Sequence, residues 1–190
     1  ITIYGGDSLS TAAGMNRFRW NMKHLGAWHE DEDRRYGDGP LARPGSYTVR
    51  LTAGDVISES AFDLRMDPRV LAQGTTIADV DAQVGMQLRL VALLSAARQL
   101  EKTLSDEKAE LEERGDALTP IERARLERVT AALDQLKTED IIYPQPKLVD
   151  QVSYLYNMIK TADQAPGEEA RQRFAVLQTA FADLESTVRD

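Results

Sequence analysis

The sequence of 190 residues contains no cysteine and only two histidines. Without cysteine the chain forms no disulfide, offers no thiolate to a metal ion and has no cysteine nucleophile. Its longest apolar runs are too short to cross a bilayer, so the sequence predicts no membrane-spanning helix. Acidic residues outnumber basic ones, with 31 aspartates and glutamates against 23 lysines and arginines, so the net charge is −8. A protein that binds a phosphate backbone needs a positive face, so we expect neither nucleic acid nor a membrane as a partner.

The residues that are present have the composition of a folded protein, since 42% are hydrophobic and 28% are charged. Glycine, proline and β-forming residues concentrate before about residue 75, and alanine, leucine and long charged residues prevail after it. The charge divides at the same place, with a net charge of −1 over residues 1–75 and −7 over residues 76–190. We therefore predict an α+β, multi-domain protein, with a β-module over 1–75 and an antiparallel helical bundle over 76–190.

The first domain is predicted to contain four strands, because apolar and polar side chains alternate in it. These strands are expected over residues 1–4, 16–22, 46–52 and 56–66. In the second strand three side chains should face a core: Phe18, Trp20 and Met22. A closed sandwich has about seven strands, so the sheet is expected to be incomplete at its N-terminal side. We expect the chain to begin inside a longer protein whose preceding segment carries the missing strands. Otherwise the helices or a partner cover an open edge.

The third and fourth strands are predicted to form a hairpin around Gly54-Asp55, which suits a two-residue turn. The register set by this turn places Arg50 opposite Glu59 on the polar face. It also places Tyr47 opposite Phe62 on the apolar face. Both pairs are of the kind that stabilises neighbouring antiparallel strands, which supports the predicted hairpin.

Residues 24–44 are rich in charge and glycine and are predicted to form a surface loop. Three aspartates of this loop carry oxygen atoms of the kind that calcium prefers: Asp31, Asp33 and Asp38. They lack the spacing of an EF-hand, and two arginines interrupt them. His24 and His29 are possible zinc ligands, but no third ligand with a closed spacing accompanies them. We therefore predict no metal site and no cofactor.

Four helices are predicted in the second domain, over about residues 77–114, 119–137, 146–163 and 166–189. Thr75 or Thr76 should cap the first helix, and Thr119 with Glu122 forms a capping box at the second. At ~1.5 Å per residue the first helix is roughly 57 Å long and the second roughly 30 Å. The second helix therefore returns along only part of the first, and the two should form a projecting arm beyond the other helices.

Apolar residues at helical spacing predict which sides of these helices face one another. In the first helix they are Leu90, Leu93, Ala97, Leu100, Leu104 and Leu111. In the third they are Val149, Val152, Tyr156 and Ile159, and in the fourth Phe174, Leu177, Phe181, Leu184 and Val188. These seams favour packing within the bundle and suggest a homo-oligomer through the helices.

No motif in the sequence indicates catalysis. The carboxylates of residues 106–113 are interleaved with Lys102, Lys108 and Arg114 on an exposed helix, whereas a glycosidase needs two carboxylates across a cleft. A nucleophile elbow, a phosphate loop and a dinucleotide fingerprint are all missing. We therefore name no catalytic residue. The candidates for contact with a ligand or partner are Trp28, His29, Tyr36, Tyr143 and Tyr154. The alternatives are that Trp28 folds back over the sheet and that Tyr143 and Tyr154 pack in or at the edge of the bundle.

Residues 13–22 (AGMNRFRWNM) and 39–51 (GPLARPGSYTVRL) resemble the C-terminal region of large bacterial β-propeller proteins of the sortilin-like or sialidase-like type. Three further strings fit the same family: MDPRV at 66–70, PKLVDQVSYLY at 146–156 and ADQAP at 162–166. The resemblance implies that the β-module is immunoglobulin-like. A departure is Asn21, where the family usually has aspartate, which weakens a contact at a turn.

The resemblance also implies an exported protein, periplasmic or secreted, whose propeller precedes this chain and is its partner. No propeller motif of the form Ser-x-Asp-x-Gly-x-Thr-Trp occurs in the sequence. We therefore expect a non-catalytic structural or interaction region, whose parent resembles glycosyl hydrolases. The alternatives are that the loop around Trp28 and His29 completes a hydrolase site of the propeller, or that Trp28 belongs to a carbohydrate-binding module.

Overall fold

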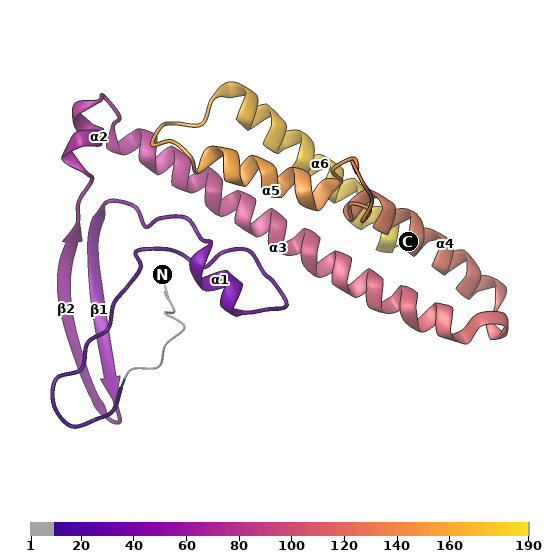
Figure 1. The fold of residues 1–190 in the computed structure, drawn as a ribbon, viewed down its shortest axis with the longest axis horizontal. Coiled ribbons are helices and arrows are strands. Elements are labelled where there is room, and N and C mark those ends of the chain that lie inside the picture. The colour runs from indigo at the N-terminus through magenta and orange to yellow at the C-terminus, as the bar shows by residue number, and fades with distance from the viewer. Residues whose placement is uncertain (1–9, 190) are drawn as a thin grey trace.

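The computed structural model describes residues 10–189, and its fold is α+β (Figure 1). A two-stranded antiparallel sheet consists of β1 (Gly45–Ala53) and β2 (Val56–Leu64). Two short helices flank it, α1 (Asp33–Gly37) and α2 (Pro68–Ala72). Four longer helices follow: α3 (Ile77–Arg114), α4 (Pro120–Leu136), α5 (Leu148–Ile159) and α6 (Glu168–Arg189). The strand expected over residues 1–4 lies outside the described residues.

The hairpin has the predicted register, with nine consecutive residue pairs from Gly45↔Leu64 to Ala53↔Val56. Arg50 lies opposite Glu59, and its Nε donates to Glu59 Oε1 at 2.5 Å. Tyr47 lies opposite Phe62, and their rings stack with centroids 5.8 Å apart. Because the two-residue turn is local, the sequence determined this part of the fold without help from distant contacts.

The strand predicted over residues 16–22 is wrong, because no strand pairs with this segment in the described part of the chain. Phe18 and Met22 are about half exposed, and Met22 has a positive φ of 59°, which interrupts an extended conformation. Trp20 nevertheless packs against the hairpin, with its ring centroid 5.6 Å from that of Tyr47 and 6.0 Å from that of Phe62. The alternating pattern therefore predicted correctly that Trp20 faces other apolar residues, but it was wrong in predicting a strand over residues 16–22.

The long helices follow the predicted boundaries closely. Thr76 caps α3 in a reciprocal contact with Asp79, and Thr119 caps α4 in the same way with Glu122. Helix α5 ends at Ile159, four residues before the predicted end. The buried Gln83 of α3 explains this, because its amide donates to the carbonyl of Ile159 at 2.8 Å and also to that of Ala162.

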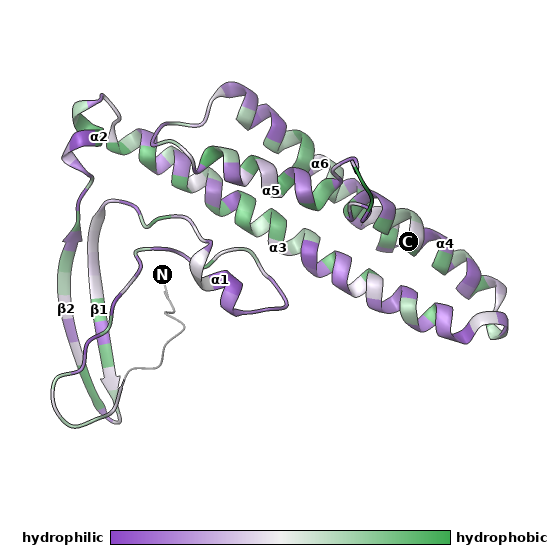
Figure 2. Ribbon diagram, in the orientation of Figure 1, coloured by the Kyte–Doolittle hydropathy of each residue, from purple (hydrophilic) through white to green (hydrophobic). Residues whose placement is uncertain are grey.

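Helix α4 runs back along the second half of α3, whereas α5 and the first part of α6 lie along the first half (Figure 1). The apolar residues of α3, α5 and α6 gather on the sides where these helices meet (Figure 2). The predicted seams are buried, apart from Leu100, Val149 and Phe181, which are partly buried against the same core. No helix of the described chain is long and apolar enough to cross a membrane.

Arg125 of α4 joins three helices. Its guanidinium binds both carboxylate oxygens of Glu107 in α3, at 2.6 and 2.9 Å, and also donates to the carbonyl of Val188 near the end of α6. The hydrogen bond from Arg125 holds the pKa of Glu107 below its usual value of 4.5. The ion pair therefore stabilises the folded protein above that pH, and this contribution is lost as the pH falls through the lowered pKa.

The expected result for Arg125→Gln is a stability that falls less steeply between pH 5 and 3 than that of the wild type. The measurement is urea unfolding at several pH values, with the exposed Arg123→Gln of the same helix as the control. If both variants changed the pH dependence equally, the contribution would come from overall charge and not from this ion pair.

Candidate functional site

Residues 24–44 were predicted to be a surface loop, but the structure packs residues 24–40, here called the docked loop, against α3 and α5. The backbone N–H of Trp28 donates to Ser95 Oγ at 2.9 Å, and Arg98 Nη1 donates to the carbonyl of Trp28 at 3.2 Å. Ala27 is buried among the core residues of the helices. The prediction failed because the partners of this loop lie on helices far along the sequence.

The end of the docked loop is held by α5. The Tyr156 hydroxyl donates to the carbonyl of Asp38 at 2.5 Å, and Lys160 Nζ lies 2.8 Å from Asp38 Oδ1. Burial, together with the negative charge of Asp38, raises the pKa of Tyr156 far above its usual value. Tyr156 therefore stays protonated and acts as a structural donor.

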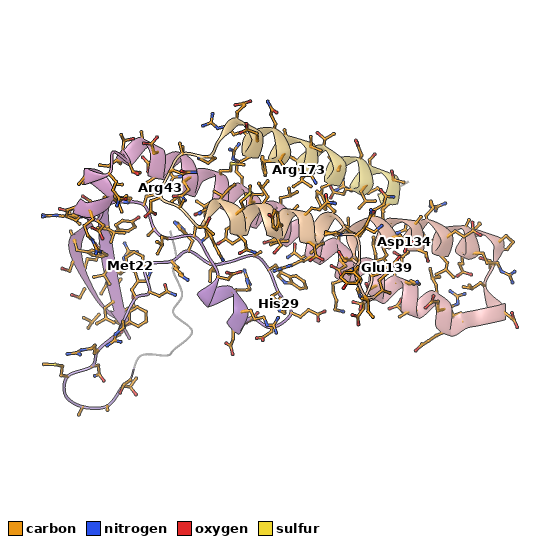
Figure 3. All side chains as sticks on the ribbon, turned by 45° about the horizontal axis from the view of Figure 1, so that its top comes forward. Met22, His29, Arg43, Asp134, Glu139 and Arg173 are labelled. Carbon is orange, nitrogen blue, oxygen red and sulfur yellow. The ribbon has the colours of Figure 1, made fainter. Side chains whose placement is uncertain are left out.

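Trp28 and His29 are half-buried at the surface of α3, and His29 takes part in local contacts (Figure 3). His29 Nδ1 accepts from the backbone N–H of Asp31 at 3.0 Å, and its Nε2 lies 3.3 Å from Arg34 Nη1. Within residues 10–189, no three histidine or carboxylate side chains are placed to hold a metal ion. These contacts make His29 part of the loop's own framework.

Of the tyrosines proposed as contacts, Tyr36 belongs to the docked loop, whereas Tyr143 and Tyr154 lie outside it. Tyr143 is 95% exposed in the link between α4 and α5, and Tyr154 is 72% exposed on α5. Tyr143 also has a positive φ of 60°, an uncommon conformation for an aromatic residue. The side chain of Tyr36 is not among those that the structure describes. Of the sequence candidates, Trp28, His29, Tyr143 and Tyr154 have described side chains. None of these four residues lines either of the two surface grooves that the structure forms at α3 and α6.

One face of the hairpin is mainly apolar and largely uncovered. The register places Tyr47, Val49 and Leu51 of β1 on the same side as Val56 and Phe62 of β2, with two serines of β2 between these last two residues. Trp20 covers the end of this face that carries Tyr47 and Phe62. At the end next to the turn, Val49, Leu51 and Val56 are half or more exposed. In the described part of the chain, no Cα atom of either strand lies within 8 Å of a helix Cα atom.

The two edges of the hairpin also lack partners among the described residues. The pair next to a two-residue turn is hydrogen-bonded, so every second residue directs its backbone N–H and C=O outward. In β1 these residues are Ser46, Thr48, Arg50 and Thr52. Natural edge strands are often protected by proline, charged side chains or a bulge. Neither strand contains proline, lysine or a bulge over its nine pairs, and the charged Arg50, Glu59 and Asp63 lie on the polar face. Both edges can therefore accept another strand.

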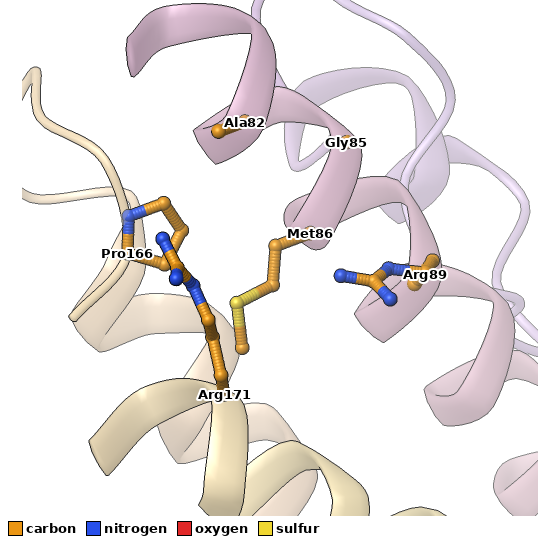
Figure 4. Close-up of a pocket in the computed structure, with 6 residues that line it drawn as sticks. All are labelled: Ala82, Gly85, Met86, Arg89, Pro166 and Arg171. Atoms are coloured by element: carbon orange, nitrogen blue, oxygen red, sulfur yellow. The ribbon is translucent and has the colours of Figure 1, made fainter. Parts of the chain in front are cut away.

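A separate groove with a volume of about 320 Å³ lies between α3 and the start of α6 (Figure 4). We call it the arginine groove. Met86 occupies the middle, with Arg89 on the α3 side and Arg171 on the α6 side. Its other lining residues are Ala82, Gly85 and Pro166. The sequence analysis missed this site, because Arg89 and Arg171 belong to different helices and no local motif connects them.

Comparisons with protein-family models, curated proteins and solved structures found no match to this chain. The argument for its function therefore depends on the geometry of the hairpin, the docked loop and the helices.

Proposed function

We propose that the chain is a non-catalytic structural and interaction region of a larger exported β-propeller protein, and that its hairpin receives further β-strands from that protein. The observation that carries the proposal is the hairpin itself, with nine residue pairs, two unpaired edges among the described residues and a largely bare apolar face.

The stability of a hairpin supports this proposal. An isolated two-stranded hairpin is marginally stable in water and needs further strands or a helix against its apolar face. Here the helices do not pack on that face, and Trp20 covers one end of it. Added strands would cover Val49, Leu51 and Val56 and would also pair with the open edges, so a single partner would satisfy both requirements.

The finer architecture belongs to the same proposal. We take the hairpin and the segment around Trp20 as part of an immunoglobulin-like module that the preceding propeller segment completes. The contact between Trp20 and Tyr47 supports this, because the two residues belong to separate strings of the family resemblance and pack 5.6 Å apart. Helices α3 to α6 form an antiparallel bundle, with the far half of α3 and α4 as a projecting arm available for self-association. By the same resemblance, the protein is periplasmic or secreted.

Leu51→Lys tests the proposal when it is introduced both into this chain and into the longer protein that contains the preceding segment. In this chain Leu51 is half exposed, so the variant should lower the free energy of unfolding by no more than about 1 kcal/mol. In the longer protein the added strands would bury the charge, and the expected loss is about 2 kcal/mol or more. The measurement is denaturant unfolding followed by circular dichroism.

The matched control is Thr52→Lys, on the polar face of the same strand, which should have a similar small effect in both proteins. Amide hydrogen exchange gives a second readout, because the outward N–H groups of Arg50 and Thr52 should become protected in the longer protein. If Leu51→Lys costs the same in both proteins and these amides exchange equally fast, the hairpin receives no strand and the proposal is wrong.

A further inference from the structure

We propose that the arginine groove binds a carboxylate that is carried on a small apolar body. This site is independent of the hairpin. Two guanidinium groups from different helices, Arg89 of α3 and Arg171 of α6, line the same groove on either side of Met86 (Figure 4). The planar fork of arginine matches the two oxygens of a carboxylate, so a pair of such groups favours this ligand class.

Neither guanidinium is engaged by a close carboxylate in the described part of the chain. Arg89 lies over the ring of Phe174, with its Cζ 5.1 Å from the ring centroid. That contact uses the face of the guanidinium and leaves its N–H groups available at the edge. The carboxylate nearest to Arg171 is that of Glu168, at 4.0 Å, which is too long for a hydrogen bond. Both arginines therefore retain donors for a ligand.

A third arginine lies close to this groove. Arg43 Nη2 would be 3.3 Å from a Cβ atom placed on Gly85, which lines the groove. Its own carboxylate partner is Asp81, at a distance of 3.9 Å. Arg43 does not itself line the groove, and Asp81 and Glu168 lie beside Arg43 and Arg171. The donors offered to an anion are therefore those of Arg89 and Arg171.

The other residues that line the groove indicate which kind of group is attached to the carboxylate of the ligand. Met86 and Pro166 are buried and form the apolar floor of the groove, and the exposed Ala82 adds apolar surface beside them. A methionine thioether adapts to flat or irregular ligands and makes favourable contacts with aromatic rings. The volume of about 320 Å³ is at the lower end for small-molecule sites. An aromatic or short aliphatic acid, or the C-terminal residue of a peptide, has this size and chemistry.

Nuclear magnetic resonance titration of the complete chain tests the site, with benzoate as the probe and benzamide as its neutral analogue. We expect saturable shifts of the amides of Gly85, Met86 and residues 167–171, with a dissociation constant on the order of 1 mM for so small a ligand. Benzamide should bind at least tenfold more weakly. Equal binding of the two probes, or benzoate shifts confined to other residues, would overturn the proposal.

Two variants and a control assign the binding to the arginines. Arg89→Gln and Arg171→Gln should each weaken benzoate binding about fivefold or more, because each removes one set of donors. Arg123→Gln removes the same charge from the exposed side of α4 and should change the affinity less than twofold. Arg89→Gln removes a contact with the ring of Phe174 and can alter its packing, whereas Arg171→Gln removes no aromatic contact. The effect of Arg171→Gln on benzoate affinity therefore tests the site independently of that packing. Equal effects of all three variants would contradict the proposal.

Further probes identify the source of the carboxylate. If N-acetylphenylalanine binds more tightly than benzoate, and its amide does not bind, the groove recognises the C-terminus of a peptide. If benzoate binds more tightly, the groove recognises a small free acid. Either result supports a carboxylate site. Inorganic phosphate that competes as well as benzoate would show that the apolar lining contributes nothing, and would overturn the proposed ligand class.

Discussion

Gly39→Ala is expected to release the docked loop from the helices. A Cβ atom on Gly39 would lie 1.8 Å from the carbonyl oxygen of His24 and 2.5 Å from its carbonyl carbon. These are backbone atoms that cannot rotate away, so the two sides of the loop must separate. The hydrogen bond of 2.8 Å from His24 N to Pro40 O would then be lost, and we expect a local destabilisation of about 3 kcal/mol or more.

Gly37→Ala is the matched control, because a Cβ atom on Gly37 would meet no atom within 4 Å. Hydrogen exchange should show loss of protection for the amides of Gly26 and Trp28 in Gly39→Ala and unchanged protection in Gly37→Ala. Circular dichroism should show that the long helices remain, because Ala27 is the one residue of this loop with a described side chain that belongs to their core. Equal behaviour of the two variants would contradict the close approach of His24 and Gly39.

Release of the docked loop would also affect Trp28 and His29, which were proposed to contact a ligand or partner. Both side chains keep their positions because the backbone on either side of them is anchored, by Ser95 and Arg98 at Trp28 and by Tyr156 at Asp38. A loop anchored in this way connects the hairpin region to the helices through hydrogen bonds of its backbone as well as through the covalent chain. We therefore expect Gly39→Ala to loosen the relation between the two regions without unfolding either.

The sequence predicted the features of this fold that local patterns determine. Helix α3 begins and ends as expected, because Thr76 caps its start and Gly115 follows its end. The hairpin register follows from two turn residues and the alternation beside them. In both cases the residues that determine the structure are neighbours in the sequence, so capping, periodicity and turn chemistry were sufficient.

The features that the sequence did not predict depend on contacts between distant residues. Residues 16–22 alternate like a strand, but a strand requires a neighbour to pair with, and the described chain pairs this region only at its end. There Ala42 N–H donates to the carbonyl of Met22 at 2.7 Å, and Lys23 forms an isolated bridge with Leu41. The docked loop looked exposed because its charges are exposed, while the contacts of its backbone with Ser95 and Tyr156 are invisible to a local pattern. The arginine groove was missed for the same reason, since Arg171 reaches α3 only after the helices have packed.

Leu136→Ala is expected to destabilise the protein by about 3–4 kcal/mol, the usual cost of removing a large side chain from a tight core. Leu136 is the last residue of α4, and no part of its side chain is exposed. The core that contains it also contains residues of α3, α5 and α6, so α4 and the other long helices share one apolar interior. We therefore expect the variant to lower the midpoint of a single cooperative unfolding transition, and not to melt α4 alone.

Ile121→Ala is the control for Leu136→Ala, because it removes a side chain of the same size from the same helix at a position that is 80% exposed. Its effect on the free energy of unfolding should stay within about 0.5 kcal/mol. Urea unfolding followed by circular dichroism measures both variants. A separate early transition in Leu136→Ala would show that α4 and the far half of α3 unfold independently. In that case α4 and the far half of α3 could self-associate while the other helices are unfolded. A single transition would mean that a partner of α4 binds the helices only when all of them are folded.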